Sequence, residues 1–264
     1  MRPRDLAAYS FLAVTWGFSF MAVLQAVQAF GWVGAVAFRA LIAGACLWAG
    51  ARLIGRKLDF SLGFWPLAII ALTTVSGQLV GISYATPRIG TAMAAILVVS
   101  VPIFSMIISR LWGLEPITPE RIAGIVLGVL GIGMLVGFPA FAITGEFLLG
   151  CAGVLAGYLC AAFGSVYASR KLEGTGAIEI TIGAFLIGGA VLLPLLWLVP
   201  VPTRPAPFDY AYLALLGVLM SATTYVVYFN LVAAIGATRA VTVEFAVTAI
   251  AVIAGQARNR QLLH

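Results

Sequence analysis

Nine long apolar runs, separated by short polar segments, make up most of this chain of 264 residues. A helix that rises 1.5 Å per residue needs about 20 residues to cross a hydrocarbon layer of about 30 Å. Helices also satisfy every backbone polar group internally, as lipid requires. The sequence therefore predicts an all-α membrane protein with nine spans, at about 6–27, 32–54, 64–84, 89–111, 121–138, 147–169, 177–199, 210–233 and 236–255.

The composition agrees with lipid as the surroundings of the chain. Only 9% of the residues are charged and 62% are hydrophobic, whereas a soluble domain carries charge on about a quarter of its residues. The first run follows Arg2 and Arg4, as the core of a cleaved signal peptide would. Its apolar part is longer than such a core and eight further runs follow, so we expect it to be retained as a span.

The formal net charge of +6 raises the alternative of a nucleic-acid partner. If the N-terminus is cytoplasmic, ten of the 15 basic residues lie on that side: Arg2, Arg4, Arg52, Arg56, Lys57, Arg110, Arg121, Arg170, Lys171 and Arg239. Membrane proteins carry such an excess on their cytoplasmic side. We therefore expect a multi-pass protein of a bacterial-type inner (plasma) membrane, with a cytoplasmic N-terminus and no nucleic-acid partner.

The chain also repeats itself at a shift of 146 residues. Residues 88–102 then fall on 234–248, with Gly90 on Gly236 and Ala94 on Ala240. The third and fourth runs match the eighth and ninth in order. Because an odd number of spans separates the copies, they cross the membrane in opposite directions. Inverted repeats of this kind are typical of secondary transporters.

Several stretches resemble a known family. They are "AVTWGFSF" at 13–20, "AFRALIAGACL" at 37–47, and the segments 88–137 and 210–255. In these the chain is similar to the EamA type of the drug/metabolite transporter superfamily, and within it to the YddG-like amino-acid exporters. The resemblance implies two inverted repeats of five helices and export of small metabolites through a central cavity. It places the first repeat at 1–138, with spans 1–5, and an incomplete second repeat at 147–264, with spans 6–9 and the tenth helix missing.

One acid lies within the last apolar run. Glu244 is the only ionisable residue between positions 240 and 254, and a charge at the centre of a membrane helix costs roughly 2.5–3.5 kcal/mol on insertion scales. Contact with lipid is therefore disfavoured, and two alternatives stay open. Glu244 borders a hydrated cavity, where it binds a substrate ammonium or exchanges a proton, or it fixes helix packing by pairing with another polar group. Arg39 in the second span is the candidate ion-pair partner.

The eighth span carries a polar stripe. Ser221, Thr224, Tyr225 and Tyr228 follow the i, i+3, i+4, i+7 spacing and therefore share one helical face. This face borders a substrate cavity or forms hydrogen bonds between helices. The repeat places Gln78 of the third span at the position equivalent to Thr224.

Four further residues are cavity candidates, and two prolines are hinge candidates. Trp16 lies in the middle of the first span with Ser19 nearby, and its indole could stack on a flat substrate or simply pack in the core. Tyr158 and Ser165, seven residues apart in the sixth span, form a weaker pair of the same kind. Pro102 and Pro194 interrupt the fourth and seventh spans and could act as hinges or as static kinks.

The sequence excludes several classes of function. There is no GxxxxGK[ST] motif for ATP. The single histidine is the last residue, His264, and the three cysteines have no metal-ligand spacing, so we expect no cofactor, no metal and no enzyme activity. A secondary transporter for amino acids, with aromatic or apolar members favoured, or for similar small metabolites is the leading hypothesis. An intramembrane enzyme and a non-transporting membrane assembly subunit are the alternatives, and the oligomeric state is left open.

Overall fold

The computed structural model describes the chain except residues 1, 115, 137–142, 172–173, 203 and 262–264. All its regular elements in the described residues are helices. In order they are α1 (Pro3–Leu53), α2 (Phe64–Ile70), η1 (Ala71–Gly77), α3 (Gln78–Leu97), α4 (Ser100–Leu111), α5 (Pro119–Val136), α6 (Gly145–Lys171), α7 (Ala177–Leu192), η2 (Leu193–Trp197), α8 (Pro207–Gly217), η3 (Val218–Thr223), α9 (Thr224–Ile235), α10 (Ala237–Ala240) and α11 (Val243–Gln261). The prediction of an all-α protein is therefore confirmed.

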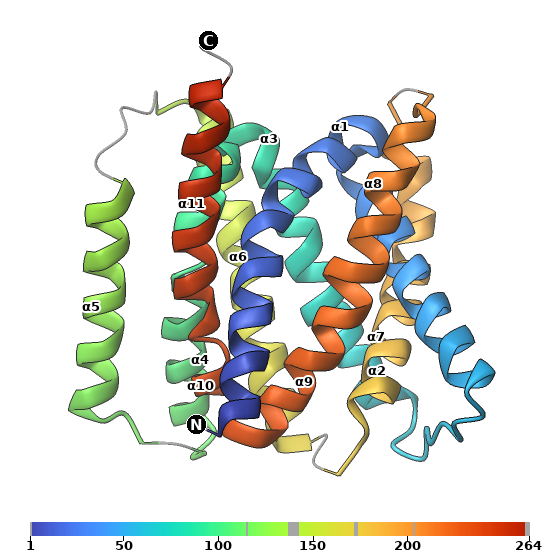
Figure 1. Cartoon of the computed structure of the whole chain (residues 1–264), viewed down its shortest axis with the longest axis horizontal. Coiled ribbons are helices and arrows are strands. Elements are labelled where there is room, and N and C mark those ends of the chain that lie inside the picture. The colour runs from blue at the N-terminus through green and yellow to red at the C-terminus, as the bar shows by residue number, and fades with distance from the viewer. Residues whose placement is uncertain (1, 115, 137–142, 172–173, 203, 262–264) are drawn as a thin grey trace.

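The 51 residues of α1 do not form one straight rod. A straight α-helix of that length would extend about 77 Å, far beyond the thickness of a bilayer. At Gly31 the backbone leaves the helical region, with φ 72° and ψ 165°. Glycine tolerates this conformation because it has no Cβ. The chain reverses its direction there, so that both parts of α1 run between the same two ends of the bundle (Figure 1).

Two helical rods contain a wide, π-helical turn. In the first, η1 (Ala71–Gly77) joins α2 to α3, and in the second, η3 (Val218–Thr223) joins α8 to α9. A shift of 146 residues places Ala71–Gly77 on positions 217–223, so the two wide turns occupy equivalent positions in the repeat. A π turn holds one residue more than an α turn and is frequent at functional sites.

Both rods then end at a glycine bend. Gly90 has φ 78° and ψ 159°, and Gly236 has φ 83° and ψ 159°. A short helical stretch and a two-residue turn follow each bend, at Val98–Val99 and at 241–242, before the longer helices α4 and α11 begin. The bend in α3 lies at the upper end of the bundle in Figure 1, whereas α9 meets α10 at the lower end.

Five continuous helical segments of the described residues are long and apolar enough to cross a membrane. They are Pro3–Leu53, Phe64–Leu97, Gly145–Lys171, Ala177–Trp197 and Pro207–Ile235, and Ser100–Leu111 is a shorter apolar helix. Because the chain bends at Gly31 and Gly90 within the first two segments, the number of continuous segments is not the number of crossings. The nine-span expectation therefore stays a prediction.

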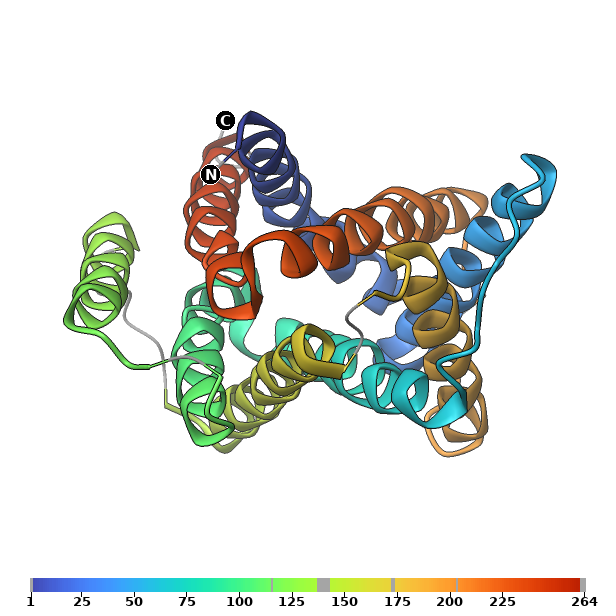
Figure 2. The same ribbon diagram turned by 90° about the horizontal axis from the view of Figure 1, so that it is seen from below.

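The central helices pack tightly around α1, which contacts α3, α7, α8 and α11. The contact of α3 with α6 depends on small residues. A Cβ built on Gly81 would lie 2.9 Å from the Cα of Gly157, so larger residues would force the two backbones apart. Helix α5 stands apart from the other helices in two perpendicular views, and its contact is with α11 (Figures 1 and 2).

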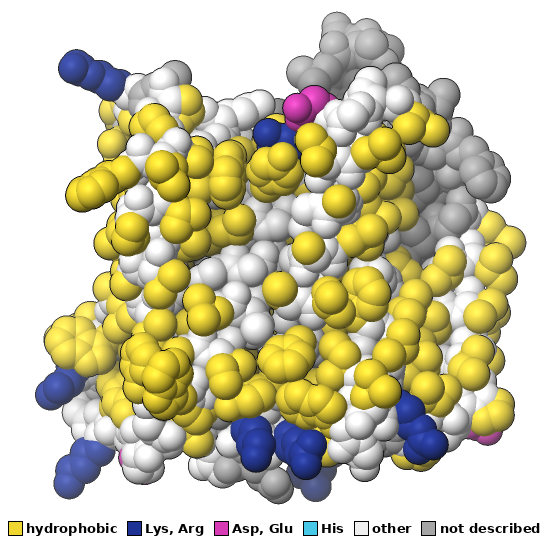
Figure 3. All heavy atoms as spheres, turned by 180° about the vertical axis from the view of Figure 1, so that it is seen from behind, with side chains coloured by type: hydrophobic (Ala, Val, Ile, Leu, Met, Phe, Trp, Pro, Cys, Tyr) yellow, Lys and Arg dark blue, Asp and Glu magenta, His cyan; other side chains and the backbone are white. Residues whose placement is uncertain are grey.

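The outer surface has the character of a membrane protein. Hydrophobic side chains cover the middle of the face in Figure 3, and Lys and Arg gather mainly along its lower edge. Large apolar side chains such as Leu127, Leu149 and Val218 are exposed. A contiguous apolar surface of this extent is rare in soluble monomers and marks contact with a membrane or a partner.

Candidate functional site

A small cavity lies in the middle of the fold, where α1, α3, α9 and α11 meet. About 40 Å³ of it is open to the centres of water molecules, which is room for a few waters and far less than a typical ligand pocket of about 300–1,000 Å³. Its lining combines polar, aromatic and aliphatic side chains. They are Trp16, Ser19, Phe20, Val23, Arg39, Gln78, Leu79, Ile82, Val98, Tyr225 and Glu244.

Arg39 reaches the cavity from the part of α1 that follows the Gly31 bend. Its side chain is buried, and both Nε and Nη2 donate hydrogen bonds to Ser221 Oγ, at 3.1 and 3.0 Å. Ser221 belongs to the π-helical segment η3, so this contact ties α1 to the wide turn. A serine hydroxyl is neutral, and the guanidinium therefore has no anionic partner within the described part of the chain.

Glu244 is the second residue of α11 and therefore lies at a helix N-terminus. The sequence placed it in the interior of one continuous span, but the turn at 241–242 divides that run into α10 and α11. The positive end of the helix dipole makes this end of a helix favourable for a carboxylate. The residue is only 7% exposed, and no hydrogen bond or ion pair of its carboxylate occurs among the described residues.

The candidate ion pair between Arg39 and Glu244 is not formed in this structure. Both side chains line the same cavity, but no N–O approach within 4.0 Å joins them. The two donor atoms of Arg39 that face η3 both donate to Ser221. The predicted ion pair depends on the similar depth of the two residues in the membrane. Depth does not fix the rotation of each helix about its axis, so it does not determine which side chains face each other.

The polar stripe of the eighth span is buried, with all four side chains at most 4% exposed. Only Tyr225 lines the cavity, and its hydroxyl donates a long hydrogen bond of 3.4 Å to Gln78 Oε1. Ser221 and Thr224 lie behind the lining and hold cavity residues, Arg39 in one case and Trp16 in the other. The wide turn η3 begins before this stretch and includes Ser221, which alters the regular spacing on which the stripe was based.

Trp16 forms the aromatic wall of the cavity. Its Nε1 donates a 3.0 Å hydrogen bond to Thr224 Oγ1, and its ring lies 5.6 Å from that of Tyr225 and 5.4 Å from that of Tyr228. Ser19, one turn further along α1, donates to the carbonyl oxygen of Trp16 at 2.7 Å. The indole is therefore held by the Thr224 hydrogen bond and by its contacts with the two tyrosine rings, and it lines the cavity.

Besides Ser221 and Thr224, three more of the predicted residues lie outside the lining. Tyr158 is fully buried, and its hydroxyl donates to the carbonyl oxygen of Ala94 at 2.7 Å. Ser165 and Tyr228 form a hydrogen bond with each other, between α6 and α9. These contacts join helices, and Tyr228 reaches the cavity only indirectly, through its ring contact with Trp16.

The two hinge candidates have different surroundings. Pro194 lies at the beginning of η2, where the α-helical part of α7 has ended at Leu192. Pro102 lies in the first turn of α4, where the missing N–H removes no helical hydrogen bond. The interruption in this part of the chain comes earlier, at Gly90 and at the Val98–Val99 turn.

Sequence reasoning missed the wholly apolar part of the lining, namely Phe20, Val23, Leu79, Ile82 and Val98. No signal could have singled them out, because apolar residues fill every span. It also missed two ion pairs, each between residues far apart in the sequence.

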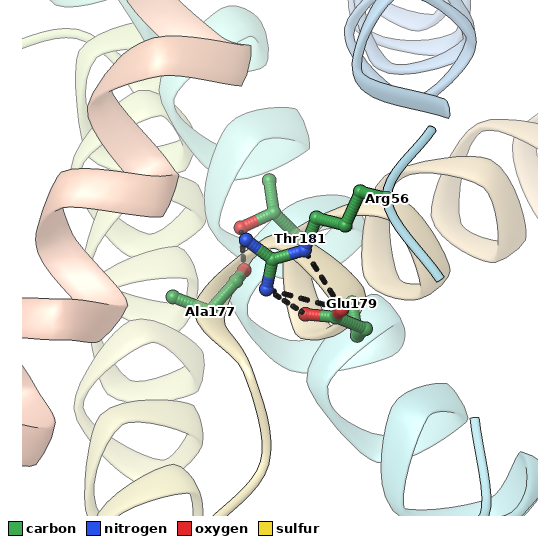
Figure 4. Close-up of polar contacts among 4 residues, drawn as sticks. All are labelled: Arg56, Ala177, Glu179 and Thr181. Carbon is green, nitrogen blue, oxygen red and sulfur yellow. Dashed lines mark hydrogen bonds and ion pairs between the residues drawn. The ribbon is translucent and has the colours of Figure 1, made fainter. Parts of the chain in front are cut away.

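The first ion pair joins the segment after α1 to the start of α7 (Figure 4). Arg56 Nη2 lies 3.3 Å from Glu179 Oε1, and the Glu179 side chain is 5% exposed. Beside it, Thr181 Oγ1 donates to the carbonyl oxygen of Ala177, in the same first turns of α7. The second pair joins α3 to α6 near the Gly90 bend, with Arg88 Nε 2.9 Å from Glu146 Oε2. The two pairs therefore lie at opposite ends of the bundle.

Two known proteins with similar sequences are transporters by name. The chain is 28% identical over 228 residues to the uncharacterized inner membrane transporter YedA of Escherichia coli K12, covering 81% of this chain and 70% of that relative. It is 24% identical over 193 residues to an uncharacterized transporter of Archaeoglobus fulgidus, covering 70% of this chain and 65% of that one.

A solved crystal structure has the same fold, with a TM-score of 0.69 over 100% of this chain and 98% of that chain, at 18% sequence identity. The pattern of one transporter family matches the sequence twice, at residues 6–137 and at 148–261. Since the two matches together cover nearly all of the sequence, the chain belongs to the EamA-like transporter family.

Proposed function

We propose that this protein is a secondary transporter that exports amino acids, in particular aromatic or apolar ones, or similar small metabolites by alternating access. The observation that carries the proposal is the central cavity. It is bordered by helices from both family matches, α1 and α3 from the first and α9 and α11 from the second. Membrane transporters with internal repeats place their substrate site at such an interface.

Two inverted repeats and nine spans form the architectural part of the proposal, with the first repeat in 1–138 and the second in 147–264. The two family matches support this division. The equivalent π turns, η1 and η3, and the equivalent bends at Gly90 and Gly236 support it independently. Because the two bends lie at opposite ends of the bundle, an inverted relationship fits them better than a parallel one (Figure 1).

The small size of the cavity supports alternating access. With about 40 Å³ open to water, the cavity cannot accept an amino acid in this conformation. Helices must therefore move apart on one side before a substrate enters and on the other before it leaves. An ion pair at each end of the bundle, Arg56–Glu179 and Arg88–Glu146, gives each side its own contact to release.

The proposed orientation has the N-terminus in the cytoplasm. Basic side chains gather along the edge of the bundle at which α1 begins (Figures 1 and 3), as the positive-inside rule describes. The similarity to an inner membrane transporter supports a location in the inner membrane. Export as the direction of transport comes from the family resemblance in the sequence.

A flux measurement tests the proposal. The purified protein is reconstituted into liposomes loaded with one labelled amino acid at a time, and efflux is compared with protein-free liposomes. We expect efflux of at least one aromatic or aliphatic amino acid. Trp16→Ala removes the aromatic wall and should reduce that efflux at least tenfold per folded protein, whereas Trp65→Ala, at an exposed position outside the cavity, should not change it.

Efflux no faster than from protein-free liposomes, for every amino acid and metabolite in the panel, would overturn the proposal. Equal efflux for the Trp16→Ala variant and the unmodified protein would remove the cavity from the transport path. The intramembrane enzyme and the assembly subunit would then be the alternatives to examine.

A further inference from the structure

We infer that Arg39 and Glu244 bind the two charged groups of a zwitterionic substrate, Arg39 the carboxylate and Glu244 the ammonium. The inference rests on the proposed function and assigns its specificity to two residues. It follows from the chemistry of the cavity, which holds one basic and one acidic side chain that are both buried and are not paired with each other.

Neither group has an oppositely charged partner in the described part of the chain. Removing a charged group from water is costly unless it is paired, and buried charges in proteins are paired as a rule. Arg39 is 5% exposed and contacts one neutral hydroxyl, that of Ser221. Glu244 is 7% exposed, and its carboxylate has no partner among the described residues. Because both groups line one cavity, a ligand bound in that cavity can supply the missing partner of each.

A zwitterion supplies both partners at once. A guanidinium has five N–H donors in a fixed planar arrangement that matches a carboxylate, and Ser221 occupies only the two donors of the Nε–Nη2 side. An ammonium has three donors and no acceptor, and an unpartnered carboxylate is the group that accepts from it. A substrate with only one charge would satisfy one residue and leave the other buried without a partner.

The remaining walls fit the rest of such a substrate. Trp16 and Tyr225 offer aromatic surfaces, and Leu79 and Ile82 offer aliphatic ones. Among the described residues of the lining, the remaining polar aliphatic side chains are Ser19, which donates to the Trp16 carbonyl oxygen, and Gln78, which accepts from Tyr225. The side chain of the zwitterion would therefore meet mainly apolar surface, and its two charged groups would meet Arg39 and Glu244.

The test compares the transported amino acid with analogues that lack one charge. In proteoliposomes, efflux of the labelled amino acid identified above is competed by the unlabelled amino acid, by the amine without its carboxylate and by the acid without its ammonium. A hydrogen bond to a charged group contributes about 1.5–3 kcal/mol, so we expect each analogue to compete about 10- to 100-fold more weakly. This part needs no variant and does not depend on the folding of one.

Two variants assign the discrimination to residues. Glu244→Gln should reduce the preference for the amino acid over the acid at least fivefold and leave its preference over the amine. Arg39→Gln should reduce the preference for the amino acid over the amine at least fivefold and leave its preference over the acid. Arg39→Lys, which keeps the positive charge, should restore part of the preference over the amine. Glu120→Gln and Arg110→Gln make the same chemical changes at exposed sites outside the cavity and serve as controls.

Ligand-induced thermal stabilisation of the purified protein in detergent measures binding without transport. Stabilisation by the zwitterion alone, lost in both variants, supports the inference even where no efflux occurs, and only the proposed function would then fail. Equal competition by the amino acid, the amine and the acid, alongside measurable efflux, overturns the inference and leaves the transporter in place. An unchanged preference in Glu244→Gln together with a lost response to a pH gradient also overturns it, because Glu244 would then exchange protons instead of binding ammonium.

Discussion

Gly90 and Gly236 share one unusual backbone conformation at equivalent positions of the two halves, with φ 78° and ψ 159° at the first and φ 83° and ψ 159° at the second. A Cβ at Gly90 would meet no other atom within 4 Å. Space is therefore not what requires glycine there. The requirement comes from the backbone, since this combination of angles is essentially confined to glycine.

Replacing either glycine should therefore destabilise the protein by strain alone. We expect Gly90→Ala and Gly236→Ala each to lower the free energy of unfolding by about 1–3 kcal/mol, measured by thermal unfolding in detergent. Gly124→Ala is the control, because Gly124 is helical with open space around it and alanine is the better helix former there. A stable Gly90→Ala variant would show that the bend is not constrained as described.

The two ion pairs at the ends of the bundle should differ in their contribution to stability. Glu146 is exposed, with 69% of its side-chain surface accessible, so Glu146→Gln should cost less than about 1 kcal/mol. Glu179 is buried, and Arg56→Gln leaves its carboxylate without a partner, at a cost of about 1–3 kcal/mol. Unfolding in denaturant measures both, and equal costs would contradict this prediction.

In the described structure, Ser221 is the only protein group that accepts hydrogen bonds from the buried guanidinium of Arg39. Removing its hydroxyl should therefore destabilise the protein. We expect Ser221→Ala to lower the free energy of unfolding by about 1–3 kcal/mol, because Arg39 then stays buried without its acceptor. Ser169→Ala is the matched control, since that hydroxyl bonds only to a carbonyl oxygen of its own helix. The double variant Arg39→Gln, Ser221→Ala should be less destabilised than the sum of the single variants if the two groups act together.

The hydrogen bond between Tyr225 and Gln78 joins equivalent regions of the two halves across the cavity. At 3.4 Å it is long, so Tyr225→Phe should cost less than about 1 kcal/mol in stability. Gln78→Leu should cost a similar amount, because the Tyr225 hydroxyl still borders the cavity and can reach water. Thermal unfolding of the two variants checks this, and a loss above 2 kcal/mol would mean that the contact is stronger than its length indicates.

The sequence predicts much of the helical framework because apolar runs in lipid leave few alternatives. The expected span at 147–169 corresponds to α6 (Gly145–Lys171), and that at 177–199 corresponds to α7 and η2 (Ala177–Trp197). The glycine bends and the π turns could not be foreseen. Glycine is frequent throughout the chain, and a wide turn uses the same residue types as a regular one.

The same limits apply to the cavity. Polar residues within spans identified Arg39, Gln78, Tyr225 and Glu244, all of which line it, because a polar side chain is costly in lipid. Their pairing could not be derived in the same way. Regular spacing does not hold across the π turn η3, and depth in a span says nothing of rotation, so Arg39 was expected to contact Glu244 but contacts Ser221.

The limited volume of the central cavity has a thermodynamic consequence for any measured affinity. A ligand that binds only an expanded conformation can bind only the fraction of molecules that is expanded at equilibrium. Its apparent dissociation constant is then the intrinsic one divided by that fraction. At about 40 Å³ the cavity seen here is too small for a ligand of amino-acid size. For such a ligand, a mutation that merely favours expansion would tighten apparent binding without adding a single contact to the ligand.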